Sequence, residues 1–299
     1  MQVFYPDTED LPLPPGHRFP AGKYRLLREK VLADGILAAV ELNASPPAVL
    51  PDLERAHDPA YVQSILAGTI GETALRRIGL PWSQTLVRRS LAAVGGSLAA
   101  ARAALDHGLS GQLAGGTHHA HRDFGSGFCV FNDLAVAALA LLAERRVTRI
   151  AILDLDVHQG DGNAAILASN PAVFVASLHG EKNFPHPKVP SDLDIGLPDA
   201  TTDTAYLAAL EQALAALATF KPELVLYLAG VDPLMQDRLG RLHLTHQGLM
   251  RRDRMVFEFC RARAIAVSIA AGGGYADPIA LSVDAYANTW RVAREVMAV

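Results

Sequence analysis

Short, continuous apolar runs alternate with helix-like segments through most of this 299-residue chain, and this alternation limits the folds that it can adopt. An apolar strand without polar alternation has to be covered on both faces, which is typical of parallel sheets flanked by helices. We therefore predict an α/β fold, with a doubly wound, mostly parallel sheet and helices on both faces. The predicted strands are Gly111–Ala114, Arg149–Leu153, Val173–Ser177, Leu224–Leu228 and Ala264–Ile269. The predicted helices are Asp133–Arg145, Asn163–Ala168, Thr204–Phe220, Gln247–Arg261 and Asp284–Met297.

The first 80 residues lack this alternation and are rich in proline, so we predict irregular structure there with one helix over Lys23–Leu32. Ser83 follows Pro81 and is the expected N-cap of a long helix that runs toward His107. No repeat, low-complexity tract or linker divides the chain. We expect a single domain over residues 1–299.

The composition argues against several classes of protein. Half of the residues are hydrophobic and 19% are charged, which favours a sizeable core over disorder. The formal charge of −4 lacks the basic excess of a general nucleic-acid binder. Two cysteines, Cys129 and Cys260, cannot form a disulfide framework or a four-cysteine zinc site. No secretory signal or membrane-spanning apolar stretch is visible, so we expect a soluble cytoplasmic protein with neither membrane nor nucleic acid as partner.

The most informative segment is the apolar strand that begins at Ile150 and leads directly into Asp154, Asp156 and His158. In extended backbone a spacing of two residues places all three side chains on one face. Burying two carboxylates with an imidazole is costly unless a cation or protons compensate. A metal ion is the simplest explanation. The structural alternative is a strand-end turn that caps the next helix, and Asp161-Gly162 is typical of such a turn.

A second buried strand ends in Asp232. Alone, an aspartate there is more often a helix cap or a turn former. The carboxyl ends of parallel strands meet at one edge of the sheet, however, so we expect Asp232 beside Asp156 and His158. Two carboxylates and one neutral imidazole leave a coordination position open, which is the pattern of a catalytic zinc site. This oxygen-rich set also suits Fe(II), Co(II) or Mn(II).

Adjacent histidines, His118 and His119, follow another strand end in a loop that begins with two glycines. A lone pair of this kind is often solvent-facing. Here Asp154 and Asp161 lie near the metal segment without being needed as ligands, and each could hydrogen-bond one imidazole and fix its tautomer. Histidine–aspartate pairs beside a metal-bound water suit general acid–base catalysis.

Three glycines and Tyr275 follow the last predicted strand. The glycines do not form a P-loop, because no Lys-Ser/Thr pair comes after them. They allow a sharp turn that could direct the Tyr275 hydroxyl into the site. A phenol there can donate to the oxyanion that forms when water attacks a carbonyl.

Seven segments, taken together and in this order, resemble the histone deacetylase superfamily, which includes acetoin-utilisation proteins and acetylpolyamine amidohydrolases and has the arginase-like fold. They are GGTHHA (Gly115–Ala120), GFCVFND (Gly127–Asp133), DLDVHQGDG (Asp154–Gly162), SLH (Ser177–His179), GVD (Gly230–Asp232), DRLGRL (Asp237–Leu242) and GGGY (Gly272–Tyr275). The resemblance extends from about His17 onward. It implies an amide hydrolase that removes acyl groups from amines.

The resemblance also implies the ligands of two cations. Zinc is expected on Asp156, His158 and Asp232, and Fe²⁺ is a possible substitute in vivo. A structural monovalent cation, usually K⁺ in the family, is expected on atoms of Asp154, Asp156, His158, Ser177 and Leu178.

Catalytic roles follow from the same resemblance. His119 is similar to the general acid–base histidine of the family and Asp161 to the residue that orients it. His118 is similar to the electrostatic partner, which is tied to Asp154. Tyr275 is similar to the tyrosine that polarises the substrate carbonyl.

Substrate binding is expected at Gly127, Phe128, Cys129 and Phe184, with the two phenylalanines lining an acyl-lysine tunnel. The opening His17–Lys23 most resembles class IV deacetylases and their bacterial relatives. The expected substrate is an acylated lysine in a peptide or protein. Alternatives are acetylpolyamines or other small acyl-amines, a binuclear manganese ureohydrolase of the arginase type, and a non-catalytic acyl-amine sensor. The sequence does not indicate an oligomeric state.

Overall fold

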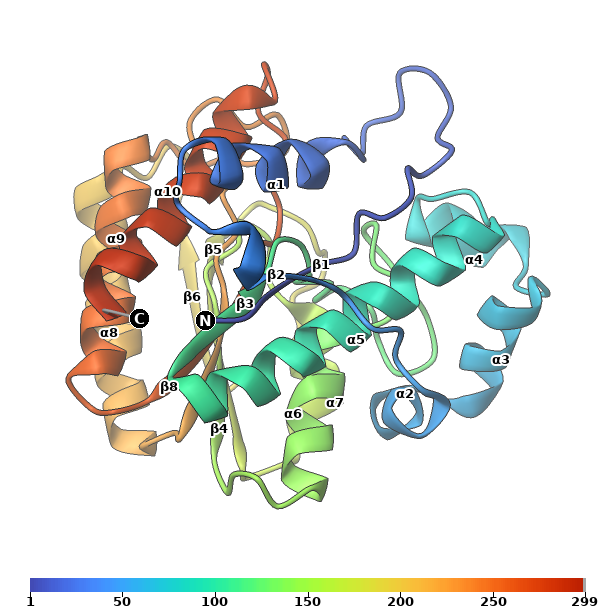
Figure 1. Cartoon of the computed structure of the whole chain (residues 1–299), viewed down its shortest axis with the longest axis horizontal. Helices are drawn as coiled ribbons and strands as arrows, with labels where there is room; N and C mark the ends of the chain where they lie inside the picture. Colours follow the sequence, from blue (N-terminus) through green and yellow to red (C-terminus); the bar gives the residue numbers. More distant parts are fainter. Residues whose placement is uncertain (298–299) are drawn as a thin grey trace.

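A computed structural model describes residues 1–297, and its centre is an eight-stranded parallel sheet in the order β2-β1-β3-β8-β7-β4-β5-β6 (Figure 1). All seven pairings between neighbouring strands are parallel, so the sheet is wholly rather than mostly parallel. The strands are β1 (Val3–Tyr5), β2 (Leu42–Ala44), β3 (Leu109–Gln112), β4 (Ile150–Asp154), β5 (Val173–Gly180), β6 (Leu193–Leu197), β7 (Leu224–Leu228) and β8 (Ala266–Ala270).

Helices cover both faces of the sheet, as the apolar strands require. One face carries α1 (Lys23–Ala33), α8 (Asp203–Phe220), α9 (His246–Arg261) and α10 (Ala280–Met297). The other carries α5 (Gln84–His107), α6 (Asp133–Ala143) and α7 (Asp161–Leu167), with α2 (Leu50–Ala56), α3 (Pro59–Ala67) and α4 (Glu72–Ile78) outside them. None of the described helices is both long and apolar enough to cross a bilayer.

The two faces of each central strand supply two separate hydrophobic cores. In β4, Ala151 and Leu153 belong to the core under α8–α10, whereas Ile150 and Ile152 belong to the core under α5 and α6. This division follows from the alternation of side chains in a strand. It explains why these strands are apolar at every position rather than at every second one.

The predicted elements from residue 83 onward are present with small shifts at their ends, and Leu224–Leu228 matches β7 at both ends. Ser83 caps α5 as expected, because its side chain accepts a hydrogen bond from the Leu86 amide. The prediction of largely irregular structure before residue 80 was wrong, since this region holds two strands and three helices besides α1. Strand β6 was also missed.

His57, at the end of α2, connects this N-terminal region to the loops around the site. Its side chain is buried, with Nδ1 2.9 Å from the carbonyl of His121, and its Nε2 accepts the Asn132 amide at 2.8 Å. Burial lowers the pKa of His57 to about 4. Protonation would also remove the acceptor for the Asn132 amide.

We expect His57 to make the protein less stable as the pH falls from about 6.5 to about 4. Since the folded state has the lower pKa, it binds fewer protons than the unfolded chain, and stability is lost over this window. The expected loss between pH 7 and pH 5 is about 2 kcal/mol. Urea unfolding at both pH values measures it, with His57→Gln as the non-titrating comparison. Parallel decreases in wild type and variant would show that another group is responsible.

Candidate active site

The carboxyl ends of β3, β4, β7 and β8 lie at one edge of the sheet, and the chemically reactive side chains of the chain follow them. The loop after β3 contains His118 and His119, and the loop after β8 contains Tyr275. The segment after β4 contains Asp156 and His158, and Asp232 follows β7. Because β7 is the neighbour of both β4 and β8, the parallel arrangement brings these loops together.

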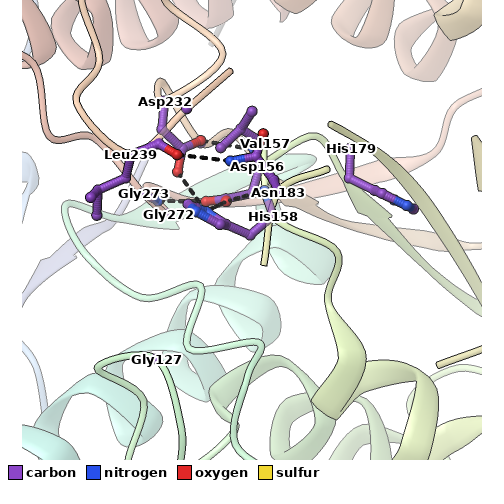
Figure 2. Close-up of polar contacts among 12 residues, drawn as sticks. Gly127, Asp156, Val157, His158, His179, Asn183, Asp232, Leu239, Gly272 and Gly273 are labelled. Atoms are coloured by element: carbon purple, nitrogen blue, oxygen red, sulfur yellow. Dashed lines mark hydrogen bonds and ion pairs between the residues drawn. The ribbon is translucent and has the colours of Figure 1, made fainter. Parts of the chain in front are cut away.

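Asp156, His158 and Asp232 each offer one ligand atom, and these three atoms lie within 4.8 Å of one another. His158 Nδ1 is 3.0 Å from Asp156 Oδ1 and 3.2 Å from Asp232 Oδ2. Figure 2 shows the three side chains directed at one another, with His179 apart from them. Backbone amides hold the carboxylates in place, since Gly273 donates to Asp156 and Val157 donates to Asp232.

These three residues fit a divalent metal ion. Bonds of 2.0–2.1 Å in a tetrahedral site place neighbouring ligand atoms about 3.3 Å apart, close to the separations of the His158 nitrogen from the two oxygens. Both carboxylates are buried. Burial and the neighbouring Asp156 carboxylate raise the pKa of Asp232, which is the mark of two negative charges without sufficient compensation. A cation between them would remove that conflict.

Each of the adjacent histidines has its own aspartate, as the sequence predicted. His118 Nδ1 donates to Asp154 at 2.7 Å, and His119 Nδ1 donates to Asp161 at 2.6 Å. With Nδ1 as the donor, Nε2 of each ring is left toward the centre of the site. His118 Nε2 lies 3.8 Å from the nearest Asp156 oxygen.

The two imidazoles have pKa values on opposite sides of neutrality. Burial lowers the pKa of His118, but the charges of Asp154 and Asp156 outweigh it and raise the value to about 9. Burial and the neighbouring His118 lower the pKa of His119 to about 4, against the hydrogen bond to Asp161. The environment therefore favours a charged His118 and a neutral His119, an asymmetry that suits a pair with two different roles.

His121 is a part of the site to which the sequence analysis gave no role. Its Nε2 lies 2.9 Å from the second oxygen of Asp161, and its ring stacks on Phe124 at 4.3 Å. Burial would raise the pKa of Asp161, but hydrogen bonds from His119 and His121 keep it below its ordinary value. The spacing of His121 two residues after His119 was the available signal.

Tyr275 is buried, and burial raises the pKa of its phenol well above the ordinary value, so the hydroxyl stays protonated and able to donate. Asp237 holds the backbone of Tyr275 in place. Its carboxylate accepts the Tyr275 amide at 2.5 Å and also the amides of Leu239 and Gly240. Asp237 begins the DRLGRL segment, but no role was assigned to it from the sequence.

A cavity of about 1070 Å³ reaches from the surface to these groups. Phe128 and Phe184 line it, with Phe184 packed edge-on against the His119 ring at 4.8 Å between ring centres. Gly127 and Cys129 also line it. A Cβ atom on Gly127 would lie 2.6 Å from His119 Cδ2, and its φ is +54°, so the wall needs glycine here.

The sequence matches the family description "histone deacetylase domain" over residues 17–290, which is most of the chain. The chain belongs to the histone deacetylase family. It is 46% identical to an uncharacterized protein of Picosynechococcus, over 98% of each chain. It is 30% identical to histone deacetylase 2 of Arabidopsis thaliana, with 87% of this chain and 70% of that protein covered. It is 31% identical to a histone deacetylase-like amidohydrolase of Pseudomonas aeruginosa, over 89% and 74%.

The family assigns a hydrolase that acts on acyl amides, in agreement with the sequence prediction. The fold agrees as well. A crystal structure of a histone deacetylase homolog in complex with SAHA superposes with a TM-score of 0.83 over 99% of this chain and 88% of that one, at 24% identity. That likeness supports the predicted arginase/deacetylase-like fold.

Asp154, Ser177 and Leu178, which are among the residues expected around a monovalent cation, lie in neighbouring strands. The register of β4 and β5 pairs Asp154 with Ser177, and Leu178 follows in β5. All three are buried, and the Ser177 hydroxyl lies 3.0 Å from His179 Nδ1. Beyond the paired strands, the Gly180 amide donates to the Val157 carbonyl at 2.9 Å.

Proposed function

We propose that this chain is a zinc-dependent deacylase that hydrolyses the amide bond of N-acyl-lysine side chains, with residues 1–299 as one catalytic domain. The observation that carries the proposal is the group of Asp156, His158 and Asp232, of which Asp156 and His158 line the same cavity as His119 and Tyr275. Metal ligands, a base and an oxyanion donor thus surround one space. The requirements of amide hydrolysis are met there.

Asp156, His158 and Asp232 would hold the metal. When bound, a zinc ion lowers the pKa of a water ligand from about 15.7 toward about 7 and polarises the acyl oxygen. The choice of zinc rests on the family and on the mixed nitrogen and oxygen donors. Fe²⁺ suits the same ligands and is the alternative occupant in vivo.

His119 is the general base and then the general acid. Its Nδ1 is bound to Asp161, so its Nε2 accepts the proton of the attacking water. The low pKa of His119 keeps the ring neutral and ready for this step. An amine is a poor leaving group, and His119 returns the proton to it as the C–N bond breaks.

Tyr275 and His118 stabilise charge on the reacting groups. The phenol of Tyr275 donates to the oxyanion of the tetrahedral intermediate. His118, paired with Asp154, acts as the electrostatic partner beside His119, whose ring centre is 4.1 Å away. The two imidazoles thus divide the work between proton transfer and charge stabilisation.

Phe128 and Phe184 bind the alkyl stem of the acyl-lysine. Each methylene buried between them contributes about 0.8 kcal/mol. Gly127 gives the stem room beside His119, and the buried Cys129 thiol, 3.4 Å from the Gly127 carbonyl, fixes the turn that presents Phe128. Phe128 has a φ of +67°, which a bulky side chain rarely adopts, so the contacts around it have to hold this turn in place.

A structural K⁺ ion is proposed beneath the metal ligands. Its ligands are atoms of Asp154, Asp156, His158, Ser177 and Leu178. The pairing of β4 with β5 supports this proposal, because it brings the two segments side by side. Such an ion would fix the backbone that presents Asp156 and His158.

We expect peptides containing acyl-lysine to be cleaved with a higher kcat/KM than acetylputrescine or acetylspermidine. Polyamines carry additional positive charge and need acidic groups at the entrance, whereas Asp156 is the only carboxylate that lines the cavity among residues 1–297. A side-by-side kinetic comparison tests this. If the polyamines are preferred by about tenfold or more, which is about 1.4 kcal/mol in the transition state, the protein is an acetylpolyamine amidohydrolase instead.

A further inference from the structure

Basic side chains surround the entrance to the active-site cavity. Six Arg and Lys side chains line the cavity, and five of them, which come from four parts of the chain, are exposed. We call them the basic collar: Arg18 before α1, Arg77 in α4, Lys182 after β5, and Arg238 and Arg241 after β7. The metal, catalytic and stem-binding residues do not include any of them.

The collar has little internal compensation. Arg241 pairs with Asp199 through two contacts of 3.0 and 2.6 Å, and Lys182 lies 3.9 Å from the same carboxylate. Within residues 1–297, no carboxylate lies within 4 Å of the charged nitrogens of Arg18, Arg77 or Arg238. Five cations therefore share a single partner, in a protein whose net charge is −4.

Two of the unpaired arginines line the same small hollow. Arg18, Arg238 and Leu239 alone line this space of about 180 Å³, and the same residues also line the main cavity. Arg238 is held toward the entrance, since its Nε donates to the carbonyl of Tyr275 at 3.3 Å. Two like charges that face one hollow repel each other, and an anion between them would relieve the repulsion.

Arg77 is held on another side of the entrance. Its guanidinium lies over the Phe124 ring at 4.5 Å, a contact that orients the side chain without neutralising it. Arg77, Arg238 and Arg241 are thus held in defined positions by their contacts. Defined cations at an entrance attract anionic ligands and reject cationic ones.

We infer that the basic collar selects substrates with carboxylates close to the acyl-lysine, namely peptide segments in which aspartate or glutamate flanks it. This inference rests on the proposed function, because it concerns the peptide residues on either side of the acyl-lysine that is hydrolysed. The stem occupies the space between Phe128 and Phe184 while the flanking carboxylates face Arg18, Arg77 and Arg238. Paired arginines are suited to this recognition, because each guanidinium presents two parallel donors to a carboxylate.

The test compares three acetyl-lysine peptides of equal length, with glutamate, glutamine or lysine on both sides. At low ionic strength we expect kcat/KM for the glutamate peptide to exceed that for the glutamine peptide by about tenfold, and the lysine peptide to be the poorest. Most of this difference should appear in KM. It should shrink toward unity in about 1 M salt, because the charges lie at the surface.

The double variant Arg18→Glu, Arg77→Glu should abolish or reverse the preference for the glutamate peptide. The ratio between peptides on the same variant cancels any effect common to all substrates, such as partial misfolding. Arg251→Glu is the matched control, because Arg251 is exposed on α9 and lines neither cavity. It should keep the wild-type ratio.

Equal rates on all three peptides at low salt, or an unchanged ratio in the double variant, would overturn the collar proposal and leave the proposed function intact. If a small neutral acetamide is hydrolysed but no peptide is, both proposals fail. The glutamine peptide separates these cases, since its cleavage tests acyl-lysine hydrolysis without the flanking charge.

Discussion

Asp232→Ala should yield a protein that retains little metal and has lost its hydrolase activity by at least about a thousandfold. Removing one of three ligands takes away a negative charge that the site needs for a divalent cation. Metal polarisation is worth several kcal/mol in the transition state, and each 1.36 kcal/mol is a factor of ten in rate. Elemental analysis of the purified variant, beside its kcat/KM, measures both effects.

Asp232→Asn separates metal loss from misfolding. Asparagine keeps the oxygen that accepts the Val157 amide at 2.8 Å but removes the charge. We expect this variant to have the wild-type circular dichroism spectrum and reduced metal content. Wild-type metal content in Asp232→Ala would remove Asp232 from the ligand set.

His119→Ala and Tyr275→Phe should each retain one metal ion per chain while losing rate. Loss of general acid–base catalysis typically costs about a hundredfold to ten-thousandfold, and loss of an oxyanion donor costs about a hundredfold to a thousandfold. Tyr275→Phe is a clean substitution, because the phenol makes no hydrogen bond with the described residues. Metal analysis and kcat on one acetyl-lysine substrate test both expectations.

Substrates that release different amines distinguish the proton transfer by His119 from the oxyanion stabilisation by Tyr275. A substrate that releases an activated aromatic amine needs less protonation, so the deficit of His119→Ala should narrow on it, while that of Tyr275→Phe should not. Wild-type turnover by Tyr275→Phe would exclude the oxyanion role. An equal deficit of His119→Ala on both substrates would exclude proton delivery to the amine.

Much of the sheet and the centre of the site could be predicted because their signals are local. Residues 224–228 are apolar at each position, and the structure has β7 over this range. The spacing of two between Asp154, Asp156 and His158 fixes their common face in any extended segment. Parallel strands then bring Asp232 to the same edge, so the sequence indicates a metal site without knowledge of the strand order.

The N-terminal helices could not be predicted in the same way. Helices α2 and α4 have seven residues each, too few for a clear apolar period, and α2 contains a proline in its first turn. Such short helices are marginal alone and depend on packing. Leu53 and Ile78 supply it here, since both are buried in the core under α5 and α6.

The contributions of Asp237 and His121 depend on long-range contacts. Asp237 lies 38 residues before Tyr275 in the sequence, and its role appears only when its carboxylate meets the Tyr275 amide. His121 has a signal in its spacing from His119, but its orientation depends on Phe124 and Asp161. Tertiary structure decides such contacts, and no local pattern encodes them.

The alternation of side chains along β4 links the packing of the two cores to the position of Asp154. Ile150 and Ile152 pack into one core, and Ala151 and Leu153 pack into the other. A slip of one residue would exchange these two sets and would turn Asp154 to the opposite face. A chain with β4 in the wrong register would therefore lose its core packing and the position of Asp154 together.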